Sequence, residues 1–287
     1  MQKCKVPGTA GIQVESKQMK GLNPPQKIDK ILFSCQNIEP LIFKLERYSR
    51  QTLFPPLGEN GQRLLQRGHV LIVGCGALGG TVADLLVRAG VGKENGRIML
   101  FDPDIVQFSN LHRQVLFTEN DARQSRLKVE AARDALLAAD PAANIEILPF
   151  RFGENHLSMV ADYDVLVDAT DNFPARFLMN RASVKYCKPF VTAGVTGASG
   201  QTMTILPGET ACLECFLRRE EAPPDGIFPI LGPSALLFGA LEALETIKIL
   251  SGNLAAANRS LFALDLWTNR SSRLDMARNK NCPVCGE

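Results

Sequence analysis

Three glycines at residues 74–79 have a spacing suited to binding phosphate. Gly74, Gly76 and Gly79 form a G-x-G-x-x-G pattern directly after an apolar, β-branched run at 70–73. In this pattern the first glycine turns the chain, the second lets a phosphate approach the backbone, and the third allows close packing of helix and strand. The unpaired N–H groups and the dipole of the following helix favour an anion there. The alternative is a tight turn that binds no ligand.

An acid and a polar loop follow the next predicted strand, at 98–101. Asp102 closes this strand, where its carboxylate can accept hydrogen bonds from both ribose hydroxyls of a nucleotide. The loop 104–117 then carries an amide, Asn110, and a guanidinium, Arg113, beside the expected phosphates. These groups suit charge neutralisation during phosphoryl or nucleotidyl transfer better than hydride transfer.

Two C-x-x-C motifs predict a metal site. One contains Cys212 and Cys215, and the other contains Cys282 and Cys285. Each motif supplies two thiolates from one tight turn, and two such turns complete a tetrahedral zinc site. A filled Cys4 shell leaves no open position for water, so we expect a structural Zn²⁺ that ties the C-terminal segment to the body of the protein. Free thiols are the alternative.

The elements that must position these residues alternate between strands and helices. Short apolar runs predict strands at 70–73, 98–101, 144–149, 164–168, 188–195, 200–206, 261–265 and 272–275. Helical spacing of apolar residues predicts helices at 58–67, from the glycine turn to residue 90, and at 126–138, 154–161, 174–186 and 234–250. This order is typical of a Rossmann-like α/β fold, with a mostly parallel sheet flanked by helices.

The stretch 102–114 closely resembles the ATP site of the MoeB/ThiF/HesA family, relatives of the ubiquitin-activating enzymes. The family pattern is D-x-D-x-V-x-x-S-N-L-x-R-Q, and this sequence matches every fixed position. The resemblance begins at R-Y-S-R-Q, residues 47–51, and continues to the C-terminus. It implies a ThiF-type adenylation domain at 47–287 and leaves 1–46 as an N-terminal extension, either partly ordered or a clamp for a partner.

The resemblance also implies roles for individual residues. Arg50 would reach the triphosphate held by a neighbouring subunit, which implies a homodimer. Lys128 would bind a phosphate, with Arg126 as a substitute if the longer loop before it shifts the register. Asp171 would handle Mg²⁺ and the nucleotide. Apart from the resemblance, the run 170–172 has the residue types that cap a helix, so helix capping is the alternative role of Asp171. The implied catalytic residues are Arg50, Asn110, Arg113, Lys128 and Asp171, and the implied ATP-binding residues are Gly74, Gly76, Gly79, Asp102, Asn110, Arg113, Lys128, Asp171 and Asn172.

The substrate that the resemblance implies is the C-terminal Gly-Gly carboxylate of a small ubiquitin-like sulfur carrier protein, as in molybdopterin or thiamine synthesis. Many family members carry a crossover cysteine that captures the carrier covalently. Here Asp225 matches that position, and no cysteine occurs from 216 to 281. Two other thiols could act instead: Cys75 in the glycine turn, and Cys187 before a strand near the ligand edge of the sheet. We expect both to be buried and inert.

Composition limits the other classes of function. The chain has 287 residues, of which 45% are hydrophobic and 22% charged, and its formal net charge of +2 argues for neither nucleic-acid nor membrane binding. No apolar run reaches the ~18 residues of a membrane span. The N-terminal lysines precede no apolar stretch, so we expect no signal peptide and a cytoplasmic protein. In that compartment cysteines serve as metal ligands or free thiols more often than as disulfides.

Three alternative functions remain open at this point. The chain could adenylate the C-terminus of a short peptide, or it could be an inactive scaffold that only docks a carrier. It could also be an NAD-dependent Rossmann oxidoreductase, although such an enzyme explains neither the loop at 109–114 nor Lys128. No rhodanese-like segment follows Cys285, so sulfur for the carrier would come from a separate donor.

Overall fold

The structure is a computed structural model that describes residues 47–218 and 228–286. The chain divides into two units, Met1–Ser49 and Arg50–Glu287, and every helix and strand described below belongs to the second. The expectations for 1–46 and for Asp225 fall outside the described residues.

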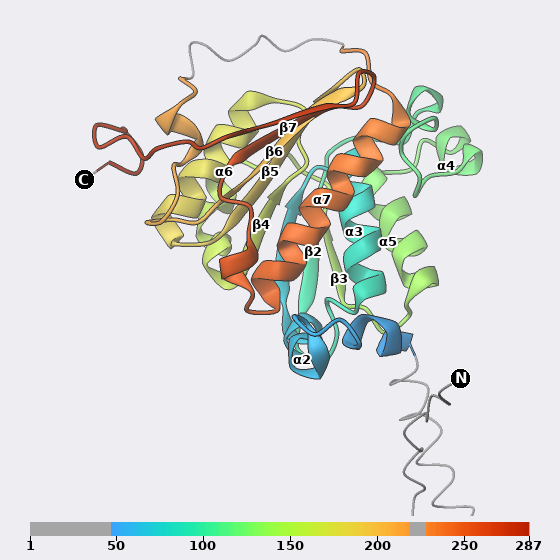
Figure 1. Cartoon of the computed structure of the whole chain (residues 1–287). Helices are drawn as coiled ribbons and strands as arrows, with labels where there is room; N and C mark the ends of the chain where they lie inside the picture. The colour runs from blue at the N-terminus through green and yellow to red at the C-terminus, as the bar shows by residue number, and fades with distance from the viewer. Residues whose placement is uncertain (1–46, 219–227, 287) are drawn as a thin grey trace, which may run out of the picture. The chain divides into compact units, whose positions relative to one another are not determined.

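The second unit is built on one sheet of eight strands in the order β3-β2-β1-β4-β5-β6-β7-β8 (Figure 1). The strands are β1 His69–Val73, β2 Arg97–Phe101, β3 Ile145–Leu148, β4 Val165–Asp168, β5 Phe190–Thr196, β6 Ser199–Ile205, β7 Leu261–Asp265 and β8 Arg270–Leu274. Strands β1 to β5 pair in parallel, and β6 to β8 continue the sheet antiparallel. This confirms the predicted mostly parallel α/β fold, with the 3-2-1-4-5 order of a doubly wound sheet.

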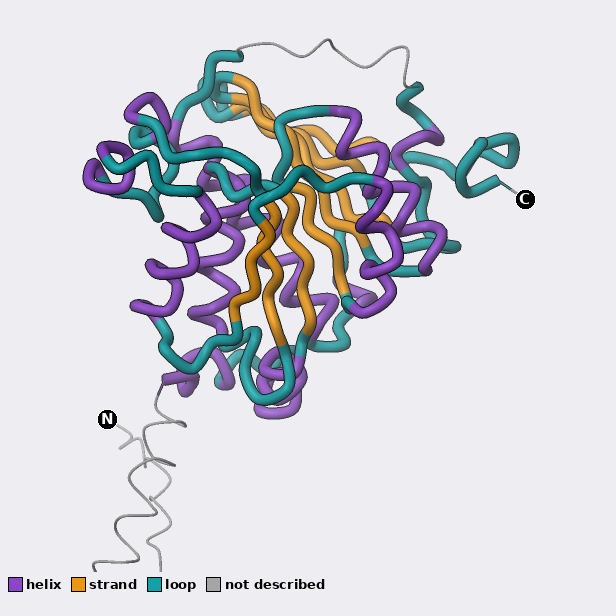
Figure 2. Tube along the Cα trace, turned by 180° about the vertical axis from the view of Figure 1, so that it is seen from behind, coloured by secondary structure: helices purple, strands orange, loops and turns teal. Residues whose placement is uncertain are grey.

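Helices cover both faces of the sheet (Figures 1 and 2). One face carries α3 Ala77–Ala89, α5 Lys128–Ala139 and α7 Gly232–Leu250, and the other carries α6 Phe173–Tyr186 with the 3₁₀ segments η3 Glu154–Asp162 and η4 Leu213–Cys215. The remaining described elements are α2 Gly58–Arg67, η2 Phe108–Asn110, α4 Glu119–Arg123 and η6 Leu254–Ala256. No described helix is both long enough and apolar enough to span a membrane.

The two faces have separate hydrophobic cores because side chains alternate along each strand. In β1, Val70 and Ile72 join the core under α3, α5 and α7, whereas Leu71 and Val73 join the core under α6. All four side chains are almost fully buried, as expected for a parallel strand covered by helices on both sides. The sheet is therefore a rigid base, and its carboxyl end can hold loops in fixed positions.

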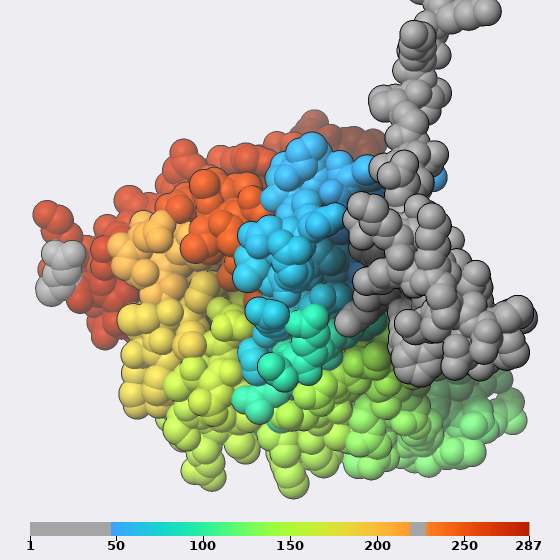
Figure 3. All heavy atoms as spheres, turned by 90° about the horizontal axis from the view of Figure 1, so that it is seen from below, coloured from blue at the N-terminus to red at the C-terminus, as the bar shows by residue number. Residues whose placement is uncertain are grey.

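Helix α7 packs closely on α3, as its small residues predict. A methyl group placed on Gly239 would lie 2.9 Å from the carbonyl oxygen of Leu78 and 2.9 Å from Cβ of Thr81. At the other end of α7, the chain passes beside the segment before α2 (Figure 3), where Asn253 Nδ2 donates to the carbonyl of Pro56 at 2.8 Å.

Several element boundaries differ from the sequence prediction by one or two residues, and two differences lie in the segment before and at the start of α5. The polar stretch 118–125 contains a short helix, α4, which Thr118 and Asp121 cap reciprocally. Helix α5 begins at Lys128 rather than at Arg126, and Leu127 is its N-cap. Both differences arise from hydrogen bonds of side chain and backbone that apolar periodicity does not report.

Candidate functional site

The glycine turn joins β1 to α3 and packs against the end of β4. Gly74 has φ +96°, and a methyl group placed on it would lie 2.4 Å from the carbonyl oxygen of Ala169. A methyl group on Gly79 would lie 1.9 Å from the oxygen of Gly74. A methyl group on Gly76 would meet only Gln114, at 3.3 Å from Nε2. The first and third glycines are thus required for the turn and its packing, while the second leaves the backbone approachable.

Asp102 fastens the end of β2 to this turn. Its Oδ2 accepts from the backbone N–H of Cys75 at 2.7 Å, and its Oδ1 accepts from the N–H of Asp104 at 2.9 Å. The residue is 6% exposed. Burial raises the pKa of Asp102, and the positive charge of Lys128 acts in the opposite direction. Each carboxylate oxygen accepts one of these hydrogen bonds and has a further lone pair to offer a hydroxyl group.

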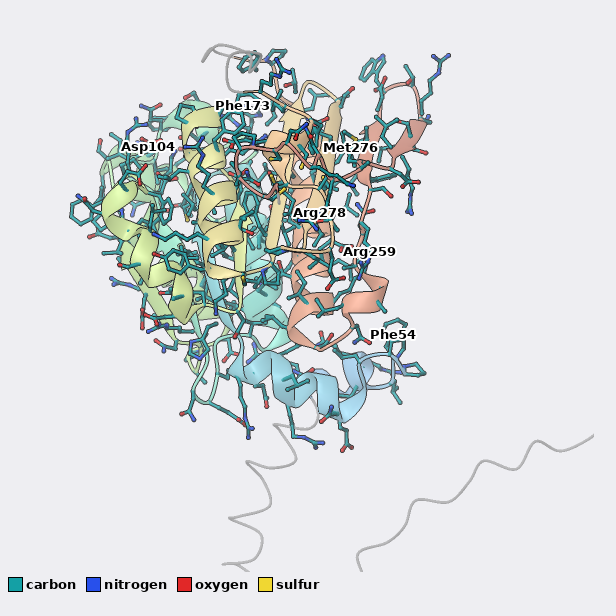
Figure 4. All side chains as sticks on the ribbon, turned by 90° about the vertical axis from the view of Figure 1, so that its left-hand side faces the viewer. Phe54, Asp104, Phe173, Arg259, Met276 and Arg278 are labelled. Carbon is teal, nitrogen blue, oxygen red and sulfur yellow. The ribbon has the colours of Figure 1, made fainter. Side chains whose placement is uncertain are left out.

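Lys128 lies at this edge of the sheet, at the first position of α5. Its Nζ is 2.9 Å from Oδ2 of Asp104, and its backbone N–H donates to the carbonyl of Asp104, which is labelled in Figure 4. Arg126 instead forms ion pairs with Asp121 at 2.9 Å and with Asp134. Of the two candidate cations, the structure therefore places Lys128 beside the turn and engages Arg126 with α4 and α5.

Asn110 and Arg113 lie in the loop between β2 and α4, where neighbouring groups in the same loop hold them. Asn110 is buried, and its Oδ1 accepts from the N–H of Gln107 at 3.3 Å. Arg113 Nη1 donates to the carbonyl of Ser109 at 2.9 Å and lies 2.7 Å from Nε2 of His112. The guanidinium has five N–H donors, so these contacts leave others for an anion.

Asp168, the last residue of β4, has a different role from the one that its position suggests. Acids at the carboxyl end of a parallel strand usually face the ligand crevice, but Asp168 is completely buried. Its Oδ2 accepts from Arg176 Nε at 2.6 Å and from Thr192 Oγ1 at 2.7 Å, and its Oδ1 accepts from the backbone N–H and the hydroxyl of Thr170. Four donors saturate this carboxylate, so it stabilises the loop instead of binding a ligand.

Asp171 and Asn172 follow this anchored loop. Asp171 is exposed, as a residue that binds a metal–nucleotide complex must be. Asn172 is the N-cap of α6, and its Oδ1 accepts from the N–H of Ala175 at 3.0 Å, which confirms the predicted cap. The side-chain oxygen of Asn172 thus caps the helix, and the amide nitrogen of the same side chain remains for a ligand.

Arg50 lies far from the glycine turn of its own chain. Gln51, the next residue, donates from Nε2 to the carbonyl of Ala89 at 3.0 Å, at the end of α3. The glycine turn lies at the start of α3, and 13 helical residues separate the two ends by roughly 20 Å. An arginine side chain cannot span that distance. Within one chain, the structure therefore does not bring Arg50 to the other predicted residues.

The four predicted metal ligands converge into one cluster, the cysteine cluster, formed by Cys212, Cys215, Cys282 and Cys285. Their sulfur atoms all lie within 4.8 Å of one another, with Cys212 and Cys282 at 3.6 Å and Cys215 and Cys285 at 3.3 Å. These distances exceed an S–S bond of about 2.05 Å and approach the about 3.8 Å expected between ligands of a tetrahedral Zn–S₄ site. The cluster could therefore hold a metal ion.

The segment that carries the second cysteine pair crosses the α6 side of the sheet. Arg278 Nη1 donates to the carbonyl of Gly208 and Nη2 to that of Cys285, each at 3.0 Å. Figure 4 labels Met276 and Arg278 on this returning segment. The cysteine cluster is thus where the C-terminal segment joins the body of the unit, as the sequence predicts.

Two cysteines of the described residues lie outside the cluster, and the burial of one of them differs from expectation. Cys75 is buried as predicted, and burial together with the nearby charge of Asp102 raises the pKa of its thiol, which disfavours the reactive thiolate. Cys187 is exposed, and the prediction that it is buried near the ligand edge is wrong. It forms the left-handed C-cap of α6 with φ 52°. It precedes β5, and a parallel strand begins at the edge opposite to its ligand edge.

Sequence reasoning missed two buried polar residues. Gln114 ends the matched loop but was not singled out, although its side chain lies against Gly76 and its Oε1 has no hydrogen-bond partner among the described residues. Glu242 of α7 is completely buried, and both of its carboxyl oxygens lack a hydrogen bond within the described chain. The position of Gln114 at the end of a phosphate-site loop was the available signal, whereas an apolar helix containing Glu242 gave none.

Comparison with known proteins gives a consistent result. The ThiF family model matches residues 48–284. The sulfur carrier protein ThiS adenylyltransferase of Bacillus subtilis is 37% identical over 248 residues, covering 84% of this chain and 71% of the relative. The sulfur carrier protein adenylyltransferase of Thermus thermophilus is 37% identical over 256 residues, covering 85% of this chain and 92% of the relative.

Among solved structures, that of Escherichia coli MccB with MccA-N7isoASN is similar, with a TM-score of 0.74 and 24% identity. The similarity covers 85% of this chain and 75% of MccB. At that identity the likeness concerns the fold alone. The family match, in contrast, spans most of the sequence, including the glycine turn, the loop after β2 and three of the four clustered cysteines. The chain therefore belongs to the ThiF family.

Proposed function

We propose that this adenylyltransferase of the ThiF family transfers AMP from Mg²⁺-ATP to the C-terminal carboxylate of a small ubiquitin-like sulfur carrier protein. The observation that carries the proposal is that Asp102, the glycine turn and Lys128 lie together at the carboxyl ends of β1, β2 and β4. This region is here called the nucleotide edge. Asp102 is bonded there to the glycine turn, and Lys128 lies beside it. The names of the two bacterial relatives support the carrier as substrate.

The proposed reaction needs charge compensation more than it needs a base. A carboxylate oxygen of the carrier forms a bond to the α-phosphorus of ATP, and the bond from that phosphorus to the bridging oxygen breaks. Pyrophosphate leaves with the electron pair, and an acyl-adenylate remains. The nucleophile is already ionised, so no general base is required. Lys128 and Arg113 would offset the negative charge, and Asn110 would donate as a neutral group.

Two groups of the site would hold the nucleotide in place. Asp102 would accept the ribose hydroxyls, and the glycine turn would receive the phosphates at the N-terminus of α3. Mg²⁺ would bind near Asp171, whose carboxylate is exposed and follows the loop anchored by Asp168. When bound, Mg²⁺ would neutralise triphosphate charge.

Arg50 would act in the site of a second subunit. Its position at the far end of α3 excludes it from its own site, whereas a homodimer could deliver it to the other chain. If so, at an ATP concentration too low to occupy the Asp102→Ala sites, mixing Arg50→Ala chains with Asp102→Ala chains should restore about a quarter of the wild-type activity, because random pairing gives half heterodimers, each with one intact site. Absence of recovery despite demonstrated subunit exchange would contradict delivery in trans.

The acyl-adenylate would be the final product on this enzyme. Among the described cysteines outside the cluster, Cys75 is buried and Cys187 lies at the opposite edge of the sheet, and position 225 is an aspartate. We therefore propose that a separate sulfur donor attacks the adenylate. Incubation with carrier and Mg²⁺-ATP should give carrier-adenylate by intact mass spectrometry, and no thiol-sensitive enzyme–carrier adduct on a non-reducing gel. An adduct would contradict the proposal.

The cysteine cluster would hold one structural Zn²⁺. Its four thiols match the preferred ligands and the tetrahedral spacing of this metal. Four protein ligands fill the coordination shell, so the ion would stabilise the returning C-terminal segment and take no part in the reaction.

A further inference from the structure

Asn180 of α6 is a completely buried amide, and one of its two polar atoms is bonded to the turn that carries the first cysteine pair. Its Oδ1 accepts from the backbone N–H of Leu213 at 2.9 Å. Because only the oxygen of a carboxamide can accept from an N–H group, this contact fixes the orientation of the side chain. The other atom, Nδ2, is therefore a donor, and it is buried without a well-formed hydrogen bond in the described chain. Such a donor is unfavourable unless an acceptor lies within its reach.

The acceptor beside this amide is the sulfur of Cys212. Leu213, which donates to the Asn180 oxygen, directly follows Cys212 in the chain. Burial raises the pKa of the Cys212 thiol, whereas the adjacent side chain of Asn180 lowers it, so the amide acts on this sulfur. A thiol is a weak acceptor, but cysteine binds a metal ion as a thiolate, after it has released its proton. A donor that faces a metal-bound thiolate would form a charge-assisted hydrogen bond, which is stronger than a neutral one.

The first cysteine pair obtains its donors in two different ways. The sulfur of Cys215 accepts from the backbone N–H of Asn279 at 3.5 Å. Cys212 is more buried, at 1% exposure, and its sulfur lies 3.6 Å from that of Cys282 and 3.9 Å from that of Cys215. No backbone N–H donates to the Cys212 sulfur in the described chain, so the side chain of Asn180 takes the place of a backbone donor there.

Helix α6 holds this donor in position. Arg181, the residue after Asn180, pairs through Nε with Oε1 of Glu214 at 3.2 Å, and Glu214 lies between the two cysteines of the first pair. Two adjacent residues of α6 thus clamp the turn 212–215 from one side. The Asn180 amide is fixed relative to Cys212 in advance of any metal, and the buried clamp leaves it little freedom to turn away.

We propose that Asn180 is a positioning residue of the metal site, whose Nδ2 donates a hydrogen bond to the metal-bound thiolate of Cys212. This inference rests on the proposed zinc site, since it requires a cation in the cysteine cluster. Asn180 would not be a ligand, because four sulfur atoms already fill a tetrahedral shell. It would offset the negative charge of the most buried ligand and hold that sulfur toward the other three.

The test measures Zn²⁺ affinity of the full chain by competition with a chromogenic chelator. Asn180→Leu removes both hydrogen bonds without adding charge, whereas Asn180→Asp keeps an acceptor for Leu213 and turns a carboxylate oxygen toward Cys212. Both should weaken Zn²⁺ about tenfold or more, as is typical when a hydrogen-bond partner of a metal ligand is lost. In Co²⁺-loaded protein, both should move the sulfur-to-cobalt charge-transfer band to longer wavelength, because a thiolate without its donor gives up electrons more easily.

A measurement on the wild-type protein keeps the test independent of how the variants fold. In ¹¹³Cd-loaded protein, NMR should detect a scalar coupling between the metal and a side-chain amide proton of Asn180, transmitted through the hydrogen bond to Cys212. The backbone N–H of Asn279, which donates to Cys215, is the positive control for such a coupling.

Ser183→Ala is the matched control variant. Ser183 is completely buried in the same helix, and its hydroxyl donates to the carbonyl of Lys188 at 2.6 Å, away from the cysteine cluster. This change should lower the melting temperature, leave Zn²⁺ affinity within about twofold of wild type and leave the cobalt band in place.

Three results would overturn the inference. Zn²⁺ affinity of both Asn180 variants within about threefold of wild type would remove the contact. A loss in Asn180→Leu alone would reduce the role of Asn180 to holding Leu213. A coupling at Asn279 without one at Asn180 would place the amide away from the sulfur. Wild-type protein that binds no Zn²⁺ would instead contradict the proposed zinc site itself, whereas the first three outcomes leave that site standing.

Discussion

The nucleotide edge and the cysteine cluster differ in whether their polar atoms have capacity left for an added ligand. In the cluster, four sulfur atoms lie within 4.8 Å of each other, and together they could fill the coordination shell of one metal ion. At the nucleotide edge, Gln114 has a buried oxygen without a partner, and Asp102 and Arg113 retain further hydrogen-bonding capacity. A closed set of ligands indicates a structural site, whereas an open set indicates a site that awaits a substrate.

Removing two thiolates of the cysteine cluster should have the largest effect, and it would test whether this cluster is a structural metal site. Cys212→Ser/Cys282→Ser should lose the metal and the coupled folding free energy, which is on the order of 10 kcal/mol for a structural zinc. Metal analysis should fall from about one zinc per chain to almost none, and the protein should unfold at a much lower temperature. An unchanged melting temperature in a metal-free variant would remove the structural assignment. Cys187→Ser, which changes an exposed cysteine outside the cluster, is the control.

Removing a cation should have the largest effect at the open site. Arg113→Ala should lower the rate of ATP–pyrophosphate exchange about a hundredfold or more, because the guanidinium would stabilise charge that develops in the transition state. The melting temperature should stay close to that of wild type, since this side chain contacts Ser109 and His112 of its own exposed loop. Exchange within threefold of wild type would contradict the role. Arg123→Ala, on the exposed face of α4, is a matched control.

The predicted ribose contact should affect affinity instead of rate. Asp102→Asn should weaken Mg²⁺-ATP by about tenfold to a hundredfold, the range for a hydrogen bond to a charged group. The maximal exchange rate should change little, because the ground state and the transition state share the ribose contact. A variant with normal affinity but slow exchange would show that Asp102 acts on the chemical step.

Part of the molecule was predictable because local sequence determined it. The strands β1, β2 and β4 follow from short apolar runs, and the roles of Gly74 and Gly79 follow from their spacing. Chain topology explains the error at Cys187: a cysteine before a parallel strand lies at the edge opposite to the ligand. The saturated carboxylate of Asp168 was not predictable, since its partners Arg176 and Thr192 come from α6 and β5.

Glu242 provides a last prediction and contrasts with Asp168. Both acids are completely buried, but four donors saturate Asp168, whereas no donor in the described chain lies in good hydrogen-bond geometry to either carboxyl oxygen of Glu242. Burial and the negative charge of Asp168 raise the pKa of Glu242 well above its usual value of 4.5, although Arg176 and the backbone N–H of Ala193 oppose the shift. Glu242 thus remains protonated in the folded protein at a pH where the unfolded chain has released the proton.

The pH dependence of stability follows from this difference. From about pH 4.5 up to the folded pKa, the unfolded chain binds fewer protons, so the contribution of Glu242 to the free energy of unfolding falls as pH rises, by about 1.4 kcal/mol per pH unit. Glu242→Gln should remove that slope, so its stability relative to wild type should increase from pH 5.5 to pH 7.5 in urea denaturation. A constant difference would show that Glu242 ionises normally.

The central claim is that the nucleotide edge activates the carboxylate of a carrier protein. Its most direct test is the exchange of labelled pyrophosphate into ATP by purified enzyme with Mg²⁺, measured with and without a candidate ubiquitin-like carrier. The account predicts exchange that depends on the carrier, and that is lost when the C-terminal Gly-Gly of the carrier is removed. Exchange supported equally by a short peptide would change the substrate class. No exchange with any carrier, together with thermal stabilisation by NAD but not by Mg²⁺-ATP, would contradict the account.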